Sequence, residues 1–186
     1  AGGLAAASSR VVSVIVPSVR NAFFAETVAT LQAELGRERL QVMLGHSEYD
    51  EREEANLVRT ALSWAPAAIV LAGLSHSPAT LKLLKSSRVP VVEIWELGHA
   101  PIDMAVGFSH AKVGAAAADH LAQRGRRRLG FIGARMQEDH RAAQRASGFL
   151  EAAIANGAER AVSLNHPAPA GVEVGGLDDL TALPEY

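Results

Sequence analysis

The sequence has no cysteine, no surplus of positive charge and no apolar run long enough to span a bilayer. The absence of cysteine excludes a disulfide scaffold and thiolate metal ligands, and it is compatible with the cytoplasm. With 18 basic and 20 acidic residues, the formal net charge is -2. An autonomous nucleic-acid binder needs overall basicity to neutralise phosphates. We therefore expect a cytoplasmic chain that does not read DNA by itself.

Membrane and secretion signals are also missing. The longest apolar stretches cover residues 11–17 and 67–74, whereas a membrane helix needs about 20 apolar residues. The first ten residues are rich in small side chains, but they lack the basic segment and the apolar segment of a secretory signal. At 186 residues, 48% of them hydrophobic, the chain is long enough to bury a core. We expect no membrane segment.

Common catalytic patterns are absent from the sequence. It has no G-x-G-x-x-G, no phosphate-binding loop and no H-E-x-x-H, and its seven histidines lack metal-ligand spacing. Ser109 and Lys112 match the S-x-x-K of some acyl transferases, but the companion motifs are missing. We expect no enzyme activity, no metal and no cofactor. An α/β kinase or dehydrogenase acting on a sugar acid is a rival hypothesis.

Strand-like and helix-like segments alternate along the chain. Continuous β-branched runs such as residues 11–16 are typical of strands covered on both faces. Helical segments begin at Asn21 or at Pro78 and stop at Gly36 or Gly125. We expect strands at 11–16, 40–44, 67–71, 89–94, 104–108 and 129–133, and helices at 21–36, 51–64, 77–86, 111–124 and 140–155. This order predicts an α/β fold with doubly wound parallel sheets, whose ligands lie beyond the carboxyl ends of the strands.

The alternation stops after Gly157. Residues 161–164 and 172–174 are strand-like, whereas residues 165–171 between them are turn material. A helical crossover between parallel strands does not fit into so few residues. We expect either a change of topology here or residues missing from the sequence near 158–172 and after 186.

Several stretches, in this order, carry a resemblance to a known family. They are Val14 to Ser18 with Asn21 to Glu26, Asp50 to Glu54 with residues 66–71, Asp119 to Arg127 with residues 129–133, Arg145 to Phe149, and Gly176 to Asp179. They resemble motifs of the effector-binding core of LacI/GalR repressors, and most closely the gluconate-type branch. Among these motifs are N-x-F-F-x-E, R-x-x-G-F and G-F-D-D. Each motif alone is weak, but their order and spacing together are specific.

The resemblance implies a two-lobed, periplasmic-binding-protein-like fold in which each lobe is a doubly wound parallel sheet flanked by helices. On this basis we divide the chain into the remnant of a DNA-contacting hinge helix at 1–9, an N-terminal lobe at 10–124 and an incomplete C-terminal lobe at 125–186. Leu4 would be the hinge leucine that wedges into the DNA minor groove. So short a helix is marginal in water without DNA. A helix-turn-helix headpiece would precede Ala1.

The resemblance also implies a transcriptional regulator. In this interpretation a homodimer binds operator DNA through the headpiece and hinge. A small sugar or sugar acid such as gluconate binds between the lobes and changes their relative angle. The family contains members that respond with either sign, so inducer and corepressor both stay open. The alternative function is that of a periplasmic sugar-binding protein of a transport system, which would be preceded by a signal peptide.

The resemblance implies two polar ligand contacts, and it implies that the ring of either Phe23 or Phe24 covers the ligand. Arg145 resembles the arginine that clamps a sugar hydroxyl or carboxylate, a task that suits its planar fork. Asp178 resembles the aspartate that accepts hydrogen bonds from sugar hydroxyls. A solvated helix arginine and a turn aspartate are the alternatives. One ring of Phe23 and Phe24 would cover the ligand, and Phe23 is the better candidate because Phe24 shares a helical face with Val28.

Residues that follow predicted strands complete the candidate set, because a doubly wound fold exposes these positions to its cleft. They are His46, Ser75, His76, Glu93, Trp95, Ser109 and His110. Ordinary loop polarity is the alternative for each polar residue. Trp95 offers a flat face that packs on a sugar, although an interface tryptophan fits equally well. Ser109 and His110 stand where the family commonly has Asp-Asn, and losing that carboxylate suits an anionic ligand such as a sugar acid.

Overall fold

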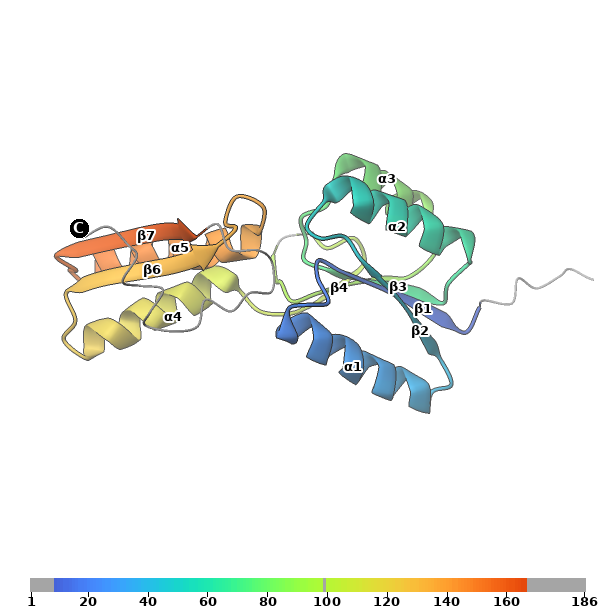
Figure 1. Cartoon of the computed structure of the whole chain (residues 1–186), viewed down its shortest axis with the longest axis horizontal. Helices are drawn as coiled ribbons and strands as arrows, with labels where there is room; N and C mark the ends of the chain where they lie inside the picture. The colour runs from blue at the N-terminus through green and yellow to red at the C-terminus, as the bar shows by residue number, and fades with distance from the viewer. Residues whose placement is uncertain (1–8, 99, 167–186) are drawn as a thin grey trace, which may run out of the picture.

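The computed structural model describes residues 9–98 and 100–166, which form two parallel α/β units joined end to end (Figure 1). The first unit has a five-stranded parallel sheet with the order β2-β1-β3-β4-β5. Its elements are β1 (Val11–Val16), α1 (Ala22–Arg37), β2 (Gln41–His46), α2 (Glu51–Ser63), β3 (Ala68–Ala72), α3 (Pro78–Ser86), β4 (Val91–Ile94) and β5 (Met104–Val106). The second unit contains α4 (His110–Gln123), β6 (Arg128–Ala134), α5 (His140–Ala155) and β7 (Arg160–His166).

Side-chain caps fix where the helices begin. At each helix start a polar residue accepts a hydrogen bond from a backbone N–H of the first turn, which satisfies a donor that the helix itself leaves free. The capping residues are Asn21, Asp50, Ser77, Ser109 and Asp139. Because three of these caps closely follow strands of one parallel sheet, the amino ends of α1, α2 and α3 face the edge where the strands end.

The first sheet is covered on both faces (Figure 1). Alternate residues of a strand point to opposite faces, so Val14 packs towards Phe24 and Val28 of α1. Ile15 packs on the other face with Val58 of α2 and Leu84 of α3. The continuous β-branched runs of the sequence are therefore buried because helices cover both sides of the sheet.

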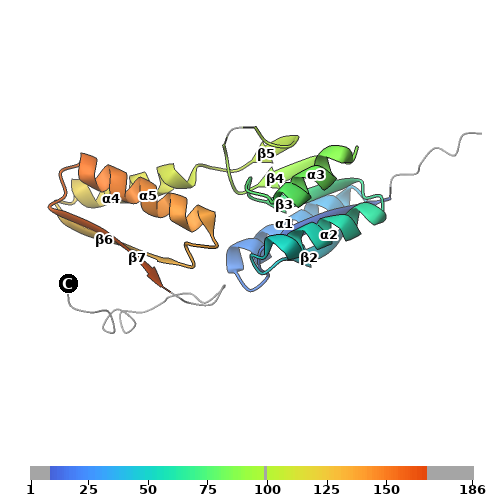
Figure 2. The same cartoon turned by 90° about the horizontal axis from the view of Figure 1, so that it is seen from above.

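In the second unit, α4 and α5 lie on the same side of the β6–β7 pair (Figure 2). Ala118 of α4 packs with Leu129, Phe149 and Ala153 in one core. The two helices approach closely where both carry glycine. A Cβ atom built on Gly114 would lie 1.9 Å from the Arg145 carbonyl oxygen, and one built on Gly148 would lie 2.1 Å from the Ala111 oxygen.

The expected α/β fold with parallel sheets is confirmed, and each expected strand and helix up to residue 155 is present with its ends within two residues. The lobe boundary differs from the one expected at residue 124. Because α4 packs against α5 and shares a core with β6, it belongs to the second unit. The division therefore falls between β5 and α4.

The segment in which residues were expected to be missing is regular as far as it is described. Residues 158–166 continue from α5 into β7, which pairs in parallel with β6 along its whole length. Leu4, Asp178 and the remaining residues of that segment lie outside the described residues. Among the helices that the structure describes, none has the length and apolar composition needed to cross a membrane.

Candidate functional site

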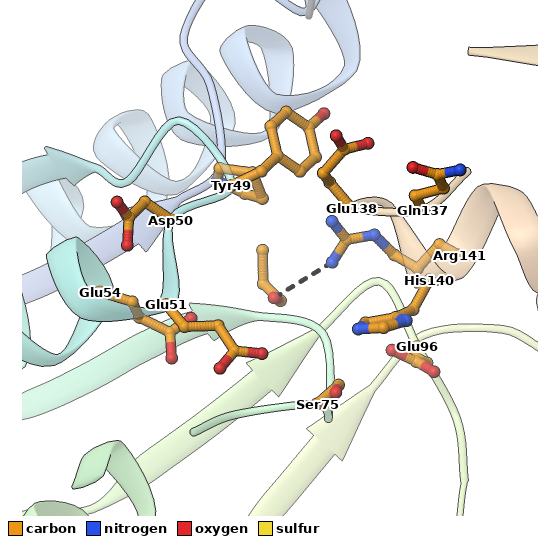
Figure 3. A pocket seen from close by; sticks show the side chains of 12 residues that line it. Tyr49, Asp50, Glu51, Glu54, Ser75, Glu96, Gln137, Glu138, His140 and Arg141 are labelled. Atoms are coloured by element: carbon orange, nitrogen blue, oxygen red, sulfur yellow. Dashed lines mark hydrogen bonds between the residues drawn. The ribbon is translucent and has the colours of Figure 1, made fainter. Parts of the chain in front are cut away.

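A cavity of about 380 Å³ lies between the two units, where strands of the first sheet end and α5 begins (Figure 3). The first unit contributes residues that follow four strands: Pro17 after β1, Tyr49, Asp50, Glu51 and Glu54 after β2, Ala72 and Ser75 at the end of β3, and Glu96 after β4. The second unit contributes Gln137, Glu138, His140 and Arg141. Parallel strands end at one edge of their sheet, so this is the position where a doubly wound fold binds its ligand.

Charge is unevenly distributed around the cavity. Figure 3 shows the carboxylates of Asp50, Glu51 and Glu54 on one side, and the Arg141 guanidinium with the side chains of His140, Glu96 and Glu138 on the other. The carboxylate side is the start of α2, and the cationic side is the start of α5. A bound molecule would therefore meet carboxylate acceptors at one end, and the Arg141 donors together with two further carboxylates at the other.

Arg141 connects the second unit to the first. Its Nη1 donates to the Ala72 carbonyl oxygen at 3.2 Å, and its Nε lies 3.3 Å from Oδ1 of Asp139. Its guanidinium also lies 5.6 Å from the ring centre of Phe24. Gly73 has a φ of +95° and no side chain, and a Cβ there would lie 2.7 Å from Nη1 of Arg141. The glycine therefore leaves the room that lets the arginine reach across.

Glu96 forms a second connection between the units. Its Oε1 accepts from Nε2 of Gln144 at 2.6 Å, and its Oε2 accepts from the backbone N–H of Leu74 at 3.1 Å. Sequence reasoning missed Glu96, Gln144 and Arg141. Two signals pointed towards them: Glu96 follows β4 just after the candidate Trp95, and Arg141 lies one helical turn before the candidate Arg145.

Of the candidate residues from the sequence that the structure describes, Ser75 lines this cavity. His46 lies at the exposed end of β2, with Nδ1 3.1 Å from Oε1 of Glu48. Phe23 is 66% exposed and lines a separate surface groove with residues of α1, whereas Phe24 is buried in the core. The structure therefore does not bring His46 or Phe23 to the cavity between the units.

Trp95 is half-buried among aromatic rings and lines the surface groove beside Phe23, not the cavity between the units. Its ring contacts those of Phe23, Phe24 and Phe108, at centre-to-centre distances of 5.7, 5.3 and 6.2 Å. Its Nε1 donates to Oγ1 of Thr27 at 3.0 Å. Its φ of +73° is unusual for a residue that is not glycine. The backbone N–H groups of Trp95 and Leu97 still donate to the carbonyl oxygens of Val106 and Phe108, and Glu96 between them lines the cavity.

His76 is buried beneath the cavity between two carboxylates. Its Nδ1 lies 2.9 Å from Oε1 of Glu54, and its Nε2 lies 3.1 Å from the Gly73 oxygen and 3.3 Å from Oε1 of Glu93. Burial alone would lower the pKa of His76, but the hydrogen bond and charge of Glu54 and the charge of Glu93 raise it above its ordinary value. Burial raises the pKa of Glu93, which also accepts from the Ile102 N–H at 2.6 Å. Both residues therefore hold together the loop beneath the cavity.

Replacing His76 with glutamine should destabilise the protein most at low pH. A histidine whose folded pKa is raised contributes stability that is fully present below about pH 6.5, the unfolded value, and is lost as the pH rises through the folded value. The difference in unfolding free energy between wild type and His76→Gln should therefore shrink as the pH rises above about 6.5.

Urea unfolding at a series of pH values measures this difference. The exposed His46→Gln variant is the control and should stay within about 0.5 kcal/mol of wild type. A difference for His76→Gln that is constant over this range, or that grows with pH, would show that His76 is not held as a cation.

The three remaining candidates lie together at the junction of the units. Ser109 caps α4 by accepting from the Lys112 N–H at 3.3 Å. His110 is buried, and its Nδ1 lies 2.8 Å from Nη1 of Arg145. Arg145 does not line the cavity, but it lies one turn after Arg141 on the same face of α5. Within the described residues, no group of three or more His, Cys, Asp or Glu side chains is arranged to hold a metal ion.

The chain was compared with known families and proteins. A family model described as "Periplasmic binding proteins and sugar binding domain of LacI family" matches residues 9–166. The chain is similar to the HTH-type transcriptional regulator GntR of Pseudomonas aeruginosa, with 36% identity over 95% of this chain and 51% of that protein. It is also similar to the HTH-type transcriptional regulator GntR of Escherichia coli K12, with 31% identity over 73% of this chain and 41% of that protein.

A solved structure agrees with these sequence relatives. The crystal structure of a LacI-family transcriptional regulator from Silicibacter pomeroyi superposes with a TM-score of 0.83 and 35% identity, covering 90% of this chain and 50% of that chain. The chain spans about half the length of the curated relatives that it matches. The similarity therefore extends through both described units, while each relative also has sequence that this chain does not cover.

Proposed function

Since the chain belongs to the LacI/GalR family, as an effector-binding core of its gluconate-repressor-like branch, we propose that it is the sensing part of a transcriptional regulator and not an enzyme. A sugar or sugar acid such as gluconate binds in the cavity between the lobes. Its binding changes the affinity of a homodimer for operator DNA in the cytoplasm. The observation that carries this proposal is a cavity lined by charged and polar side chains of both lobes, in a chain whose relatives are named as regulators.

The distribution of charge around the cavity favours a sugar acid. The carboxylate of such a molecule would accept charge-assisted hydrogen bonds from Arg141, whose planar donors match a carboxylate. Its hydroxyl groups would donate to carboxylates at the start of α2. A neutral sugar could offer Arg141 only hydroxyl oxygens, which form weaker hydrogen bonds with it than a carboxylate does. The cationic and acidic sides of the cavity therefore match the two ends of a sugar acid.

The many carboxylates of the cavity do not argue against an anionic ligand, because several already have partners. Asp50 accepts from the backbone N–H groups of Arg52 and Glu53 at the start of α2. Glu54 pairs with His76, and Glu96 accepts from Gln144 and from the Leu74 N–H. A carboxylate compensated in this way repels an anion less than a free one does.

The contacts between the lobes give the mechanism a structural basis. Arg141 and Gln144 of the second lobe hold the Ala72 carbonyl and Glu96 of the first, so a ligand that engages Arg141 competes with or adds to these bonds. A ligand changes the lobe angle only if its affinity for one angle exceeds its affinity for the other. In the homodimer the lobe angle would set the spacing of two hinge segments, and through them operator binding by a helix-turn-helix headpiece.

Calorimetric titration of the intact protein against a panel of sugars and sugar acids tests the ligand class. We expect gluconate or another sugar acid to bind more tightly than the matching neutral sugar. Equal affinity for the acid and the neutral sugar would contradict the role given to the cationic side of the cavity. The intact sequence distinguishes a transcriptional regulator from a sugar-binding protein of a transport system. A helix-turn-helix segment before the core would favour the regulator, whereas a secretion signal there would favour transport.

A further inference from the structure

Both ring nitrogens of His110 form hydrogen bonds, one to the first lobe and one within the second. As the first residue of α4, it places Nε2 2.8 Å from the carbonyl oxygen of Trp95, and its Nδ1 lies 2.8 Å from Nη1 of Arg145. A carbonyl oxygen only accepts hydrogen bonds, and a guanidinium only donates them. The Nε2 atom must therefore carry the proton, and Nδ1 must be the acceptor. His110 is thus held as one neutral tautomer.

Arg145 needs an acceptor in this position. It lies on α5 one turn after Arg141, so two guanidinium groups project from the same face of the helix. Burial lowers the pKa of Arg145, Asp139 raises it, and Arg141 lowers it again, although an arginine stays charged in proteins. Among the described residues, His110 is the one side chain that hydrogen-bonds the Arg145 guanidinium. Its neutral ring therefore fixes where that cation points.

A second proton on His110 would reverse this arrangement. Protonated Nδ1 could no longer accept, and an imidazolium would lie 2.8 Å from a guanidinium. The pKa of His110 is lowered, chiefly by burial and also by the charges of Arg145 and Arg141 in α5. The hydrogen bond to the Trp95 carbonyl and the charge of Glu96, which follows β4, act in the opposite direction but do not reverse the shift. The ring is therefore neutral at pH 7 and gains a second proton only below the ordinary histidine pKa of about 6.5.

We propose that His110 is a positioning residue of the effector site, which as a neutral acceptor aims the Arg145 guanidinium at the cleft and releases it when protonated. This proposal rests on the proposed function, because it assumes that an anionic effector binds beside the arginines of α5. It makes effector affinity depend on pH although the sugar acid does not change its charge above about pH 5.

Two substitutions separate the hydrogen bonds of His110. In His110→Asn the amide oxygen falls near the position of Nδ1 and can accept from Arg145, but the shorter side chain does not reach the Trp95 carbonyl. In His110→Gln the amide nitrogen falls near the position of Nε2 and can donate to that carbonyl, but the acceptor for Arg145 is displaced. The two variants are both neutral amides, so they form a matched pair.

Calorimetric titration of the intact variants with D-gluconate tests the proposal. We expect His110→Asn to bind within about threefold of wild type and His110→Gln to bind about tenfold more weakly, as for one lost hydrogen bond to a charged group. Thermal unfolding of each variant measures fold stability separately. The proposal would be overturned if the two variants bound gluconate equally or if His110→Gln bound more tightly.

A pH series on the wild type requires no substitution. The dissociation constant for gluconate should rise in the wild type as the pH falls below about 6.5, the ordinary histidine pKa, because Arg145 is released, and it should stay nearly constant over the same range in His110→Asn. A wild-type affinity that does not change with pH, or an equal change in both proteins, contradicts the role of His110.

The failure of this proposal can be told apart from the failure of the proposed function. A wild-type protein that binds no gluconate at any pH overturns the effector class and the role of His110 together. Gluconate binding that is unaffected by either substitution overturns the role of His110 alone and leaves the effector class in place.

Discussion

Replacing Gly148 with alanine should lower the free energy of unfolding of the intact protein by about 3 kcal/mol, the upper end of the usual cost of overpacking. The added Cβ would lie 2.1 Å from the carbonyl oxygen of Ala111 in α4, and this neighbour is backbone. The helices can accommodate the methyl group only by moving apart, which opens the core around Ala118 and Phe149. Chemical denaturation monitored by circular dichroism measures the loss.

The same substitution at Gly36 is the matched control. Gly36 lies in the last turn of α1, and an added Cβ there would meet nothing within 4 Å. Alanine at such a helical position should raise the free energy of unfolding by about 0.5–1 kcal/mol, because glycine gives the unfolded chain more freedom. If Gly148→Ala did not lower the free energy of unfolding, like Gly36→Ala, the close crossing of α4 and α5 would be incorrect.

Replacing Arg141 with alanine should raise the dissociation constant for a bound sugar acid about 100-fold, or about 2.7 kcal/mol. Removing a charge-assisted hydrogen-bond partner typically costs about 1.5–3 kcal/mol, and Arg141 also provides a contact between the lobes. The affinity for a matching neutral sugar should fall less, since it lacks the carboxylate. Isothermal titration of both molecules gives the comparison.

Two variants serve as controls for Arg141. Arg141→Lys keeps the charge but loses the planar fork, so it should recover only part of the affinity. Arg37→Ala removes an arginine on the exposed side of α1, where its partner is Glu34, and it should leave affinity unchanged. An Arg141→Ala variant that binds a sugar acid within about threefold of wild type would exclude Arg141 from the site.

The strands and helices could be predicted because their signals are local. Continuous β-branched residues such as those of β1 specify a strand covered on both faces, and caps such as Asn21 and Ser77 specify where helices begin. The lobe to which α4 belongs could not be predicted in the same way. Its alanines and Gly114 suit any closely packed helix, and only the contact with Gly148 shows which helix it meets.

The position of the cavity could be predicted, but few of the side chains that line it could. Parallel strands place the residues after β2, β3 and β4 at one edge, which is why Ser75 lines the cavity. His76 is the next residue, yet its side chain turns inward to Glu54 and Glu93. The effector contacts assigned by resemblance, including Arg145 and Asp178, stay predictions.

Conformations that depend on tertiary contacts account for the remaining differences. Trp95 adopts a φ of +73° and packs among aromatic rings, whereas Glu96, the next residue, lines the cavity. Arg141 reaches the first lobe because Gly73 leaves room for it. Neither the backbone turn nor the contact between the lobes has a signature in the spacing of residues along the chain.

The measurement that tests the central claim most directly is the operator affinity of the intact protein with and without its tightest-binding sugar or sugar acid. Fluorescence anisotropy with a labelled fragment of its own promoter provides both values. We predict that the ligand changes the dissociation constant for the operator at least about fivefold, the lower end of typical allosteric coupling, and that Arg141→Ala abolishes the change at the same ligand concentration. An operator affinity that is the same with and without saturating ligand would contradict the account.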